Sequence, residues 1–246
     1  MKQVDKDTKE KRHKQYNEWA RKRPAYVFIV IPILLSVVMS VNEMLETRTW
    51  IIAGTYLLSI SAVSTALFFL LKLTLRDIAK LYPEKLLFLD CIKPTNRLLY
   101  SNDENYTEEK KAAIRRKIKE KKGIDLQKQK LKTCDNKKYV KRVNEAVSWL
   151  LDVTRFDDIL FEYNCFYGFW RNLTAALLVD SLFLFGLAAF NKWVCQLPLG
   201  NAFVWIAFIV LLVSFVTTTI TYKNGMVFAR KVYDVFMNLG DEKENY

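Results

Sequence analysis

Four apolar blocks interrupt a chain that is otherwise rich in charged residues. The blocks cover residues 26–41, 50–71, 173–190 and 202–222. A helix needs about 17–25 mostly apolar residues to cross a bilayer, so each block predicts a membrane-spanning helix, the first at the short end of that range. Pro32 lies inside the first block and predicts a kink there. The chain is therefore expected to be an all-α, multi-pass membrane protein with four spans.

The loops between these blocks differ in positive charge. The N-terminal tail, the segment 72–171 and the C-terminal tail are rich in Lys and Arg, whereas the loops after the first and third blocks carry only Arg48 and Lys192. The positive-inside rule therefore places both termini and the long segment in the cytosol, with Trp50 and Trp193 at the outer boundary. No small-x-small cleavage motif follows the first block, which favours a signal anchor over a signal peptide.

This topology divides the chain into five regions. They are a basic cytosolic tail (1–24), a first transmembrane hairpin (25–72), a basic cytosolic domain (73–171), a second transmembrane hairpin (172–222) and a C-terminal amphipathic helix with its tail (223–246). The cytosolic domain is expected to be helical, with one helix between a Thr107 cap and Gly123 and another over 138–161. The apolar positions of the first of these helices are too sparse to predict a buried helix.

The composition limits the chemistry that the chain can perform. Lys and Arg number 38 against 26 Asp and Glu, and a net charge of +12 predicts an acidic partner such as lipid head groups, nucleic acid or nucleotides. His13 is the only histidine, none of the four cysteines forms a CxxC pair, and no glycine-rich phosphate loop is present. Asp157 and Asp158 are adjacent and do not converge on one helix face. We therefore expect no enzyme, no cofactor and no metal site.

Between residues 110 and 142 almost every charge is positive, and this segment is called the basic run below. One interpretation is a solvated helix face or a polybasic patch on anionic lipid. The other is a phosphate-binding surface on which tyrosines stack bases. The candidates for that surface are Arg115, Arg116, Lys119, Lys122, Lys138 and Arg142, with Tyr100, Tyr106 or Tyr139 nearby.

Two polar features lie inside the predicted spans. Asp180 lies within the third span, where a carboxylate costs roughly 2.5–3.5 kcal/mol on insertion scales. It predicts either a pore-lining or proton-sensing acid, or a structural residue that makes a helix–helix hydrogen bond or lies close enough to the cytosolic interface to stay hydrated. The fourth span carries a polar stripe at helical spacing, formed by Ser214, Thr217, Thr218 and Thr221. This polar stripe can line a conduction path, but an ordinary packing face is the favoured interpretation.

Two segments carry a family resemblance. The segments are KPTNRLLY (93–100) and WLLDVTRFDDILFEYNCFYGFWRN (149–172). They combine a Pro-Thr-x-Arg turn before a charged helix, a Thr-Arg-acidic element, and a Tyr-Gly-Phe-x-Arg-Asn motif at the mouth of a span. The chain resembles a family of bacterial membrane proteins in this combination, and within it the small membrane component of Hailong-type anti-phage defence. The matching positions are Pro94, Thr95, Arg97, Thr154, Arg155, Tyr167, Gly168, Phe169, Arg171 and Asn172, whereas Asn96 stands where many relatives carry a second threonine.

The resemblance implies an oligomeric ion channel of the bacterial inner membrane, with a tetramer as the expected assembly, partnered with a nucleotidyltransferase. Deoxyadenylate oligomers made by that enzyme would bind the cytosolic domain and hold the channel shut, and their loss would open it. The rival hypothesis is a non-conducting membrane scaffold whose basic domain recruits an acidic or nucleic-acid partner.

The motif adds further ligand-binding candidates to those of the basic run. Arg155, Trp170 and Arg171 are expected to form a cationic, aromatic pocket beside the pore helices, and Arg97 and Tyr167 come with the matching motifs. The alternative is that Tyr167 and Trp170 anchor the chain at the interface while Arg171 extends toward lipid head groups.

Overall fold

The computed structural model describes residues 2–27, 30, 50–84, 93–100, 103–127, 137–190, 192–193 and 200–239. All regular secondary structure within these ranges is helical, which confirms the all-α prediction. Most of the first predicted span lies outside the described residues.

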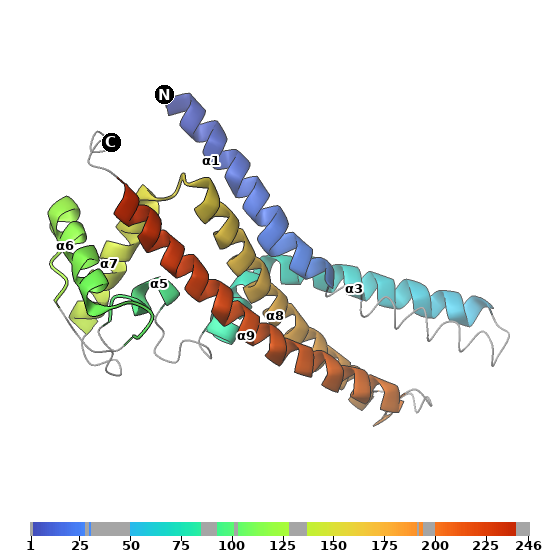
Figure 1. Ribbon diagram of the computed structural model, residues 1–246. Helices are drawn as coiled ribbons and strands as arrows, with labels where there is room; N and C mark the ends of the chain where they lie inside the picture. The colour runs from blue at the N-terminus through green and yellow to red at the C-terminus, as the bar shows by residue number, and fades with distance from the viewer. Residues whose placement is uncertain are drawn as a thin grey trace. The chain divides into compact units, whose positions relative to one another are not determined.

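The helices fall into two compact units (Figure 1). The helices are α1 (Lys2–Tyr16), η1 (Asn17–Lys22), α3 (Trp50–Ala79), η2 (Lys80–Glu84), α5 (Pro94–Arg97), α6 (Glu108–Lys122), α7 (Lys137–Val153), α8 (Asp158–Phe190) and α9 (Gly200–Asn238). The first unit comprises Met1–Pro83 and Gly168–Thr221, and the second comprises Glu84–Tyr167 and Tyr222–Tyr246. Helices α8 and α9 therefore contribute to both units.

Two helices of the described residues are long and apolar enough to cross a membrane, Asp158–Ala189 and Asn201–Asn238. They contain the third and fourth predicted spans, but both helices are longer than the spans. The helix predicted over 138–161 ends at Val153, because Thr154–Asp157 form a turn. Asp157 begins α8 by accepting a hydrogen bond from the Leu160 backbone at 2.8 Å, as an N-cap does. The C-terminal amphipathic helix is continuous with α9.

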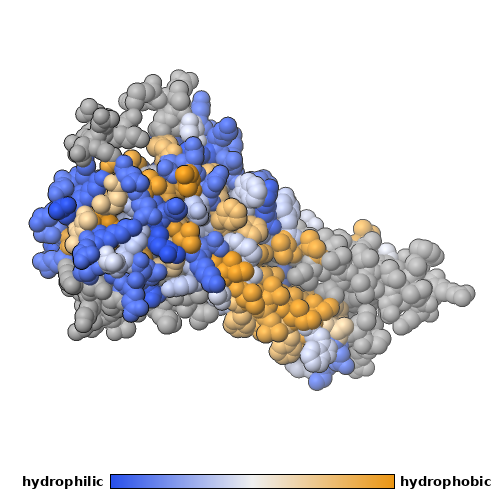
Figure 2. Space-filling view, viewed as in Figure 1, coloured by the Kyte–Doolittle hydropathy of each residue, from blue (hydrophilic) through white to orange (hydrophobic). Residues whose placement is uncertain are grey.

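In the first unit, α8 lies beside α9 and packs small residues against the end of α3. Leu177 and Leu184 of α8 are buried with Ala207 and Val210 of α9, and a second cluster joins α8 alanines to α3. Gly168 allows a close approach, because a Cβ there would lie 2.7 Å from the Tyr16 hydroxyl. The outer face of α9 is apolar and exposed, and Figure 2 shows apolar residues gathered over this helix. Such a face suits contact with lipid acyl chains.

In the second unit, α6 and α7 enclose the C-terminal part of α9. Thr107 accepts a hydrogen bond from the Lys110 backbone at 3.4 Å, and Gly123 ends α6 with φ 73°, so both predicted caps are confirmed. Ile114 and Ile118 of α6 are completely buried in the core around Tyr233. The expectation that α6 carries too few apolar residues for burial is therefore wrong, because two isoleucines one turn apart are enough to fill a narrow contact stripe.

Candidate functional site

The polar stripe of α9 lies against α8 in the first unit. All four of its residues, Ser214, Thr217, Thr218 and Thr221, are buried. The Ser214 hydroxyl donates to the Thr174 carbonyl of α8 at 3.1 Å, and the hydroxyl oxygens of Thr174 and Thr221 lie 3.1 Å apart. The Thr217 and Thr218 hydroxyls donate to the Ser214 carbonyl at 2.9 and 2.8 Å. Within one chain this arrangement is a helix-packing face, which is one of the two interpretations of the stripe.

Asp180 differs from these neighbours because its polar atoms have no partner. Its side chain is 0% exposed, and among the described residues neither carboxylate oxygen accepts a hydrogen bond. The adjacent Ser181, in contrast, donates to the Ala207 carbonyl at 3.1 Å. Asp180 is also the only charged residue between Arg171 and Lys192. The helix–helix hydrogen bond, one of the interpretations of Asp180, is absent from the described part of the chain, so Asp180 is an unexplained buried polar group of α8.

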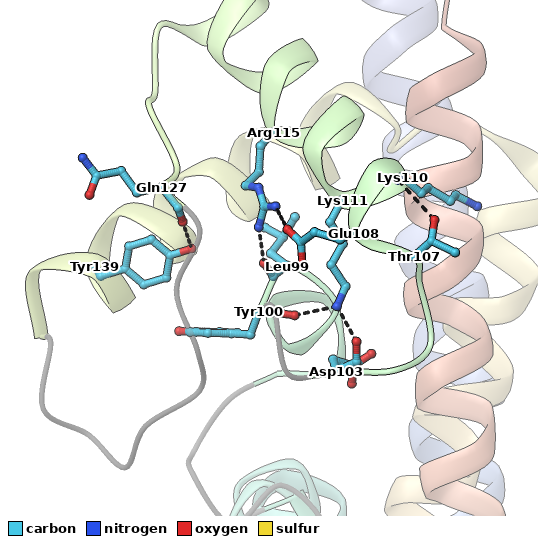
Figure 3. A network of polar contacts seen from close by, with 10 residues as sticks. All are labelled: Leu99, Tyr100, Asp103, Thr107, Glu108, Lys110, Lys111, Arg115, Gln127 and Tyr139. Carbon is cyan, nitrogen blue, oxygen red and sulfur yellow. Dashed lines mark hydrogen bonds and ion pairs between the residues drawn. The ribbon is translucent and has the colours of Figure 1, made fainter.

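Two cations of the basic run lie inside the second unit (Figure 3). The Lys111 ammonium donates to the Tyr100 carbonyl at 2.8 Å and to the Asp103 carbonyl. The Arg115 guanidinium donates to the Leu99 carbonyl at 3.1 Å and pairs with Glu108. The two side chains hold the Leu99, Tyr100 and Asp103 backbone carbonyls to α6. Arg115 is thus placed in the interior and not on an open phosphate-binding surface, and the structural role of Lys111 was not predicted.

Other cations of α6 also have partners within the chain. Lys110 pairs with Asp234 at 2.9 Å, and Lys117 donates to the Met237 and Leu239 carbonyls at 3.0 and 2.6 Å. The Lys117 ammonium therefore satisfies free carbonyls at the end of α9.

The remaining α6 candidates lie on the surface. Arg116 pairs with Glu120 at 3.7 Å, Lys119 pairs with Asp125 at 2.9 Å, and Lys122 is exposed. Exposed pairs of this kind contribute about 0–1 kcal/mol, so they can exchange for a phosphate. Arg116, Lys119 and Lys122 are thus the α6 side chains that remain available to a ligand. Lys138 and Arg142 are exposed on α7.

The tyrosines predicted to stack bases lie in different environments. Tyr100 and Tyr139 are buried edge to face, with ring centroids 5.6 Å apart. Burial raises the pKa of the Tyr139 hydroxyl, which donates to the Gln127 carbonyl at 2.9 Å. Tyr106 is half-buried, with the Lys110 ammonium 4.1 Å from its ring centroid. None of these three rings is an exposed stacking platform.

The Pro-Thr-x-Arg turn is a packing junction of the second unit. Pro94, Thr95 and Asn96 are buried. The Tyr233 hydroxyl donates to the Thr95 carbonyl at 2.7 Å, and the Asn96 amide donates to Asn144. Arg97, a ligand-binding candidate, pairs with Asp103 at 3.2 Å and is only partly exposed.

The second motif divides between the two units. Tyr167 belongs to the second unit, where it stacks on Phe228 with centroids 6.2 Å apart and donates to Glu84 at 2.9 Å. Arg155 is exposed in the second unit, whereas Trp170 and Arg171 are half-buried in the first. The pocket expected from Arg155, Trp170 and Arg171 therefore stays a prediction.

The described residues contain no group of three or more His, Cys, Asp and Glu side chains that could hold a metal ion. Comparisons of this chain with protein-family models, with curated proteins and with solved structures return no match. The class that the fold defines is an all-α protein with two helices able to span a membrane.

Proposed function

We propose that this chain is one subunit of an oligomeric, ion-conducting protein of a bacterial inner membrane, with both termini in the cytosol. The observation that supports this proposal is the environment of Asp180. Its side chain is a buried carboxylate without a hydrogen-bond partner among the described residues, in a helix that can span a bilayer. An intramembrane carboxylate is costly, and those that persist face a bundle interior or a water-filled path.

The conduction path requires several copies of the chain. Within one chain the space between α8 and α9 is filled by Leu177, Leu184, Ala207 and Val210, and the polar stripe is hydrogen-bonded there. The path therefore uses the side of α8 that bears Asp180, and because the carboxylate is enclosed by its own chain, opening must bring water to it. A ring of acids at such a position favours cations.

The cytosolic domain supplies the control in this proposal. An anionic nucleotide or oligonucleotide binds the exposed side of α6 at Arg116, Lys119 and Lys122, whose surface ion pairs are weak enough to exchange. The resemblance to the Hailong-type membrane component implies both the ligand and the direction of gating. An oligodeoxyadenylate made by a partner nucleotidyltransferase holds the pore closed. Helices α8 and α9 contribute to both units, so the unit that binds the ligand is covalently continuous with the membrane helices.

Ion flux through the purified chain in liposomes tests this proposal, with and without short oligodeoxyadenylates and oligoriboadenylates. We expect flux from the wild type, suppression by the deoxy oligomer, and at least about tenfold less flux from Asp180→Asn, because the acid that concentrates the cation is lost. The matched control is Asp77→Asn, an exposed acid of α3. Absence of flux from folded wild-type protein would reject conduction.

A separate variant tests the proposed ligand-binding site on α6. Replacing Arg116, Lys119 and Lys122 together by Glu should abolish suppression by the oligomer while flux persists. These three positions are preferred to Arg115, whose guanidinium is committed to the Leu99 carbonyl and Glu108. Retained suppression in this variant would place the ligand elsewhere.

A non-conducting membrane scaffold is the second candidate. The observation that favours it is the burial of the polar stripe between α8 and α9, which leaves those hydroxyls no aqueous path to line. A scaffold predicts no flux under any condition, together with oligonucleotide binding that the same three α6 reversals abolish.

A further inference from the structure

An exposed row of aromatic, cationic and apolar side chains leads from η1 into the predicted first span. Trp19, Arg23, Tyr26 and Val30 follow one another at intervals of four, three and four residues, which is the spacing of one helix face. All four side chains are exposed, Tyr26 and Val30 by 50% each. The other side of this segment is buried, since Ala25 packs against α3. These four side chains are called the η1 stripe below.

The cation of the η1 stripe is stacked on an aromatic ring. The central carbon of the Arg23 guanidinium lies 3.3 Å from the centroid of the Trp19 ring. A guanidinium stacked in this way keeps its N–H donors in its own plane and directed away from the ring. In the described part of the chain, the guanidinium forms no ion pair or hydrogen bond. Arg23 is therefore a positioned donor group that has no acceptor within that part of the chain.

Other cations close to Arg23 in the first unit are paired with acids. Lys22 pairs with Glu18 at 2.5 Å, and Lys80 of η2 pairs with Asp77 of α3 at 2.9 Å. The pair with Lys22 occupies the carboxylate that lies nearest to Arg23 in the sequence. The charge of Arg23 is thus left for a partner outside the described chain.

We infer that the η1 stripe binds one anionic phospholipid of the inner leaflet. The Arg23 guanidinium donates to the phosphate group, as its planar donor set allows. Trp19 holds the guanidinium in place at the level of the head groups, and one acyl chain covers Tyr26 and Val30.

The order of the side chains along the η1 stripe favours a lipid over a soluble phosphate. Trp19 and Arg23 precede the apolar block that begins at Tyr26, and tryptophan and arginine are typical of the border where a cytosolic helix enters a bilayer. The Tyr26 ring stacks on Phe68 of α3 with centroids 5.3 Å apart, so it offers a fixed apolar surface next to the cation. A soluble phosphate would contact Arg23 alone, whereas a phospholipid contacts the whole stripe.

This site goes beyond the proposed conduction. It rests on the membrane placement given above but not on ion flux, because lipid binding is measured on the purified chain. Native mass spectrometry of the full chain in uncharged detergent, titrated with phosphatidylglycerol or phosphatidylcholine, gives the dissociation constant of the first bound lipid. The variants are Arg23→Gln, Arg23→Lys and Trp19→Leu. The matched control is Arg76→Gln, the same change at an exposed arginine of α3 with no ring contact in the described chain.

The wild type should bind phosphatidylglycerol at least about fivefold more tightly than phosphatidylcholine. Arg23→Gln should weaken phosphatidylglycerol binding by at least about tenfold, because a charge-assisted hydrogen bond to the phosphate is lost, and Arg76→Gln by less than about twofold. Arg23→Lys and Trp19→Leu keep the charge but lose the stacked guanidinium, so each should weaken binding by about threefold. All these side chains are exposed, so the variants should melt together with the wild type.

Four results would overturn the site. Unchanged binding by Arg23→Gln would exclude its guanidinium as the phosphate donor, and equal losses in Arg23→Gln and Arg76→Gln would indicate a diffuse positive surface. Equal affinity of the wild type for the two lipids would exclude an anionic ligand. Displacement of the lipid by inorganic phosphate at equal concentration would mean that Tyr26 and Val30 add nothing to recognition.

Discussion

Replacement of Lys111 by Met should destabilise the second unit more than any other single change of charge in α6. The side chain is 1% exposed, and its ammonium donates to the Tyr100 and Asp103 carbonyls. Methionine fills a similar volume without donating a hydrogen bond, so both carbonyl oxygens lose this partner.

The magnitude follows from the two acceptors. The Tyr100 carbonyl keeps the Asp103 backbone N–H as a donor at 3.3 Å, so it loses only one of two partners. The Asp103 carbonyl loses the ammonium, and a buried acceptor left without a partner costs about 1–3 kcal/mol. Removing a buried ammonium returns part of this, because burying a charge is itself unfavourable. We therefore expect a net loss of about 2 kcal/mol. For a chain of this size that lowers the melting temperature by roughly 4–8 °C.

The assay is thermal unfolding in detergent, followed by far-UV circular dichroism. The matched control is Lys122→Met, which makes the same chemical change at an exposed position of the same helix. It should change stability by less than about 0.5 kcal/mol. If Lys111→Met melts together with Lys122→Met, the contacts of Lys111 with the Tyr100 and Asp103 carbonyls do not stabilise the second unit, and the basic run has no structural role at this position.

Two further predictions concern the second unit. Gly225→Ala should cost about 1–3 kcal/mol in thermal unfolding, because the new Cβ would lie 2.9 Å from the Tyr167 ring and 3.2 Å from Pro94, whereas Gly186→Ala, which meets nothing within 4 Å, should be neutral or stabilising. If Gly225→Ala and Gly186→Ala lose the same free energy of unfolding, the steric explanation is wrong. Stability should also fall as pH rises above about 10, since burial raises the pKa of Tyr106, Tyr139 and Tyr233 and the unfolded chain then releases these protons first. Tyr139→Phe should reduce but not abolish that alkaline fall in a urea titration, and an unchanged slope would contradict the contribution of Tyr139.

The parts of the fold that follow from periodicity and capping could be predicted from the sequence. The apolar blocks at 173–190 and 202–222 fall within α8 and α9, and the Thr107 and Gly123 caps bound α6. The ends of the long helices could not be predicted in this way, because hydropathy marks where a helix is apolar and not where its hydrogen bonding ends. Helix α9 therefore continues to Asn238 through charged residues that also suit a cytosolic helix.

The candidate site was harder to predict because a sequence gives the charge of a side chain but not its partner. Sequence alone predicts that the basic run faces solvent, anionic lipid or phosphate. In the structure Lys111 and Arg115 instead bind backbone carbonyls inside the second unit, and Lys117 binds those at the end of α9. A long aliphatic stem can be buried while the cation reaches carbonyl oxygens, so a charged helix can still contribute to a core.

Net charge is consequently a poor guide to which cations of this chain act on a partner. A cation that already binds carbonyls or a nearby acid gains little from an added anion, because the new contact replaces an existing one. The same reasoning separates Asp180 from the polar stripe of α9: the stripe is satisfied by contacts with α8 and within α9, whereas the carboxylate is not. A buried polar group without a partner, and not the sum of charges, therefore indicates where this protein needs water.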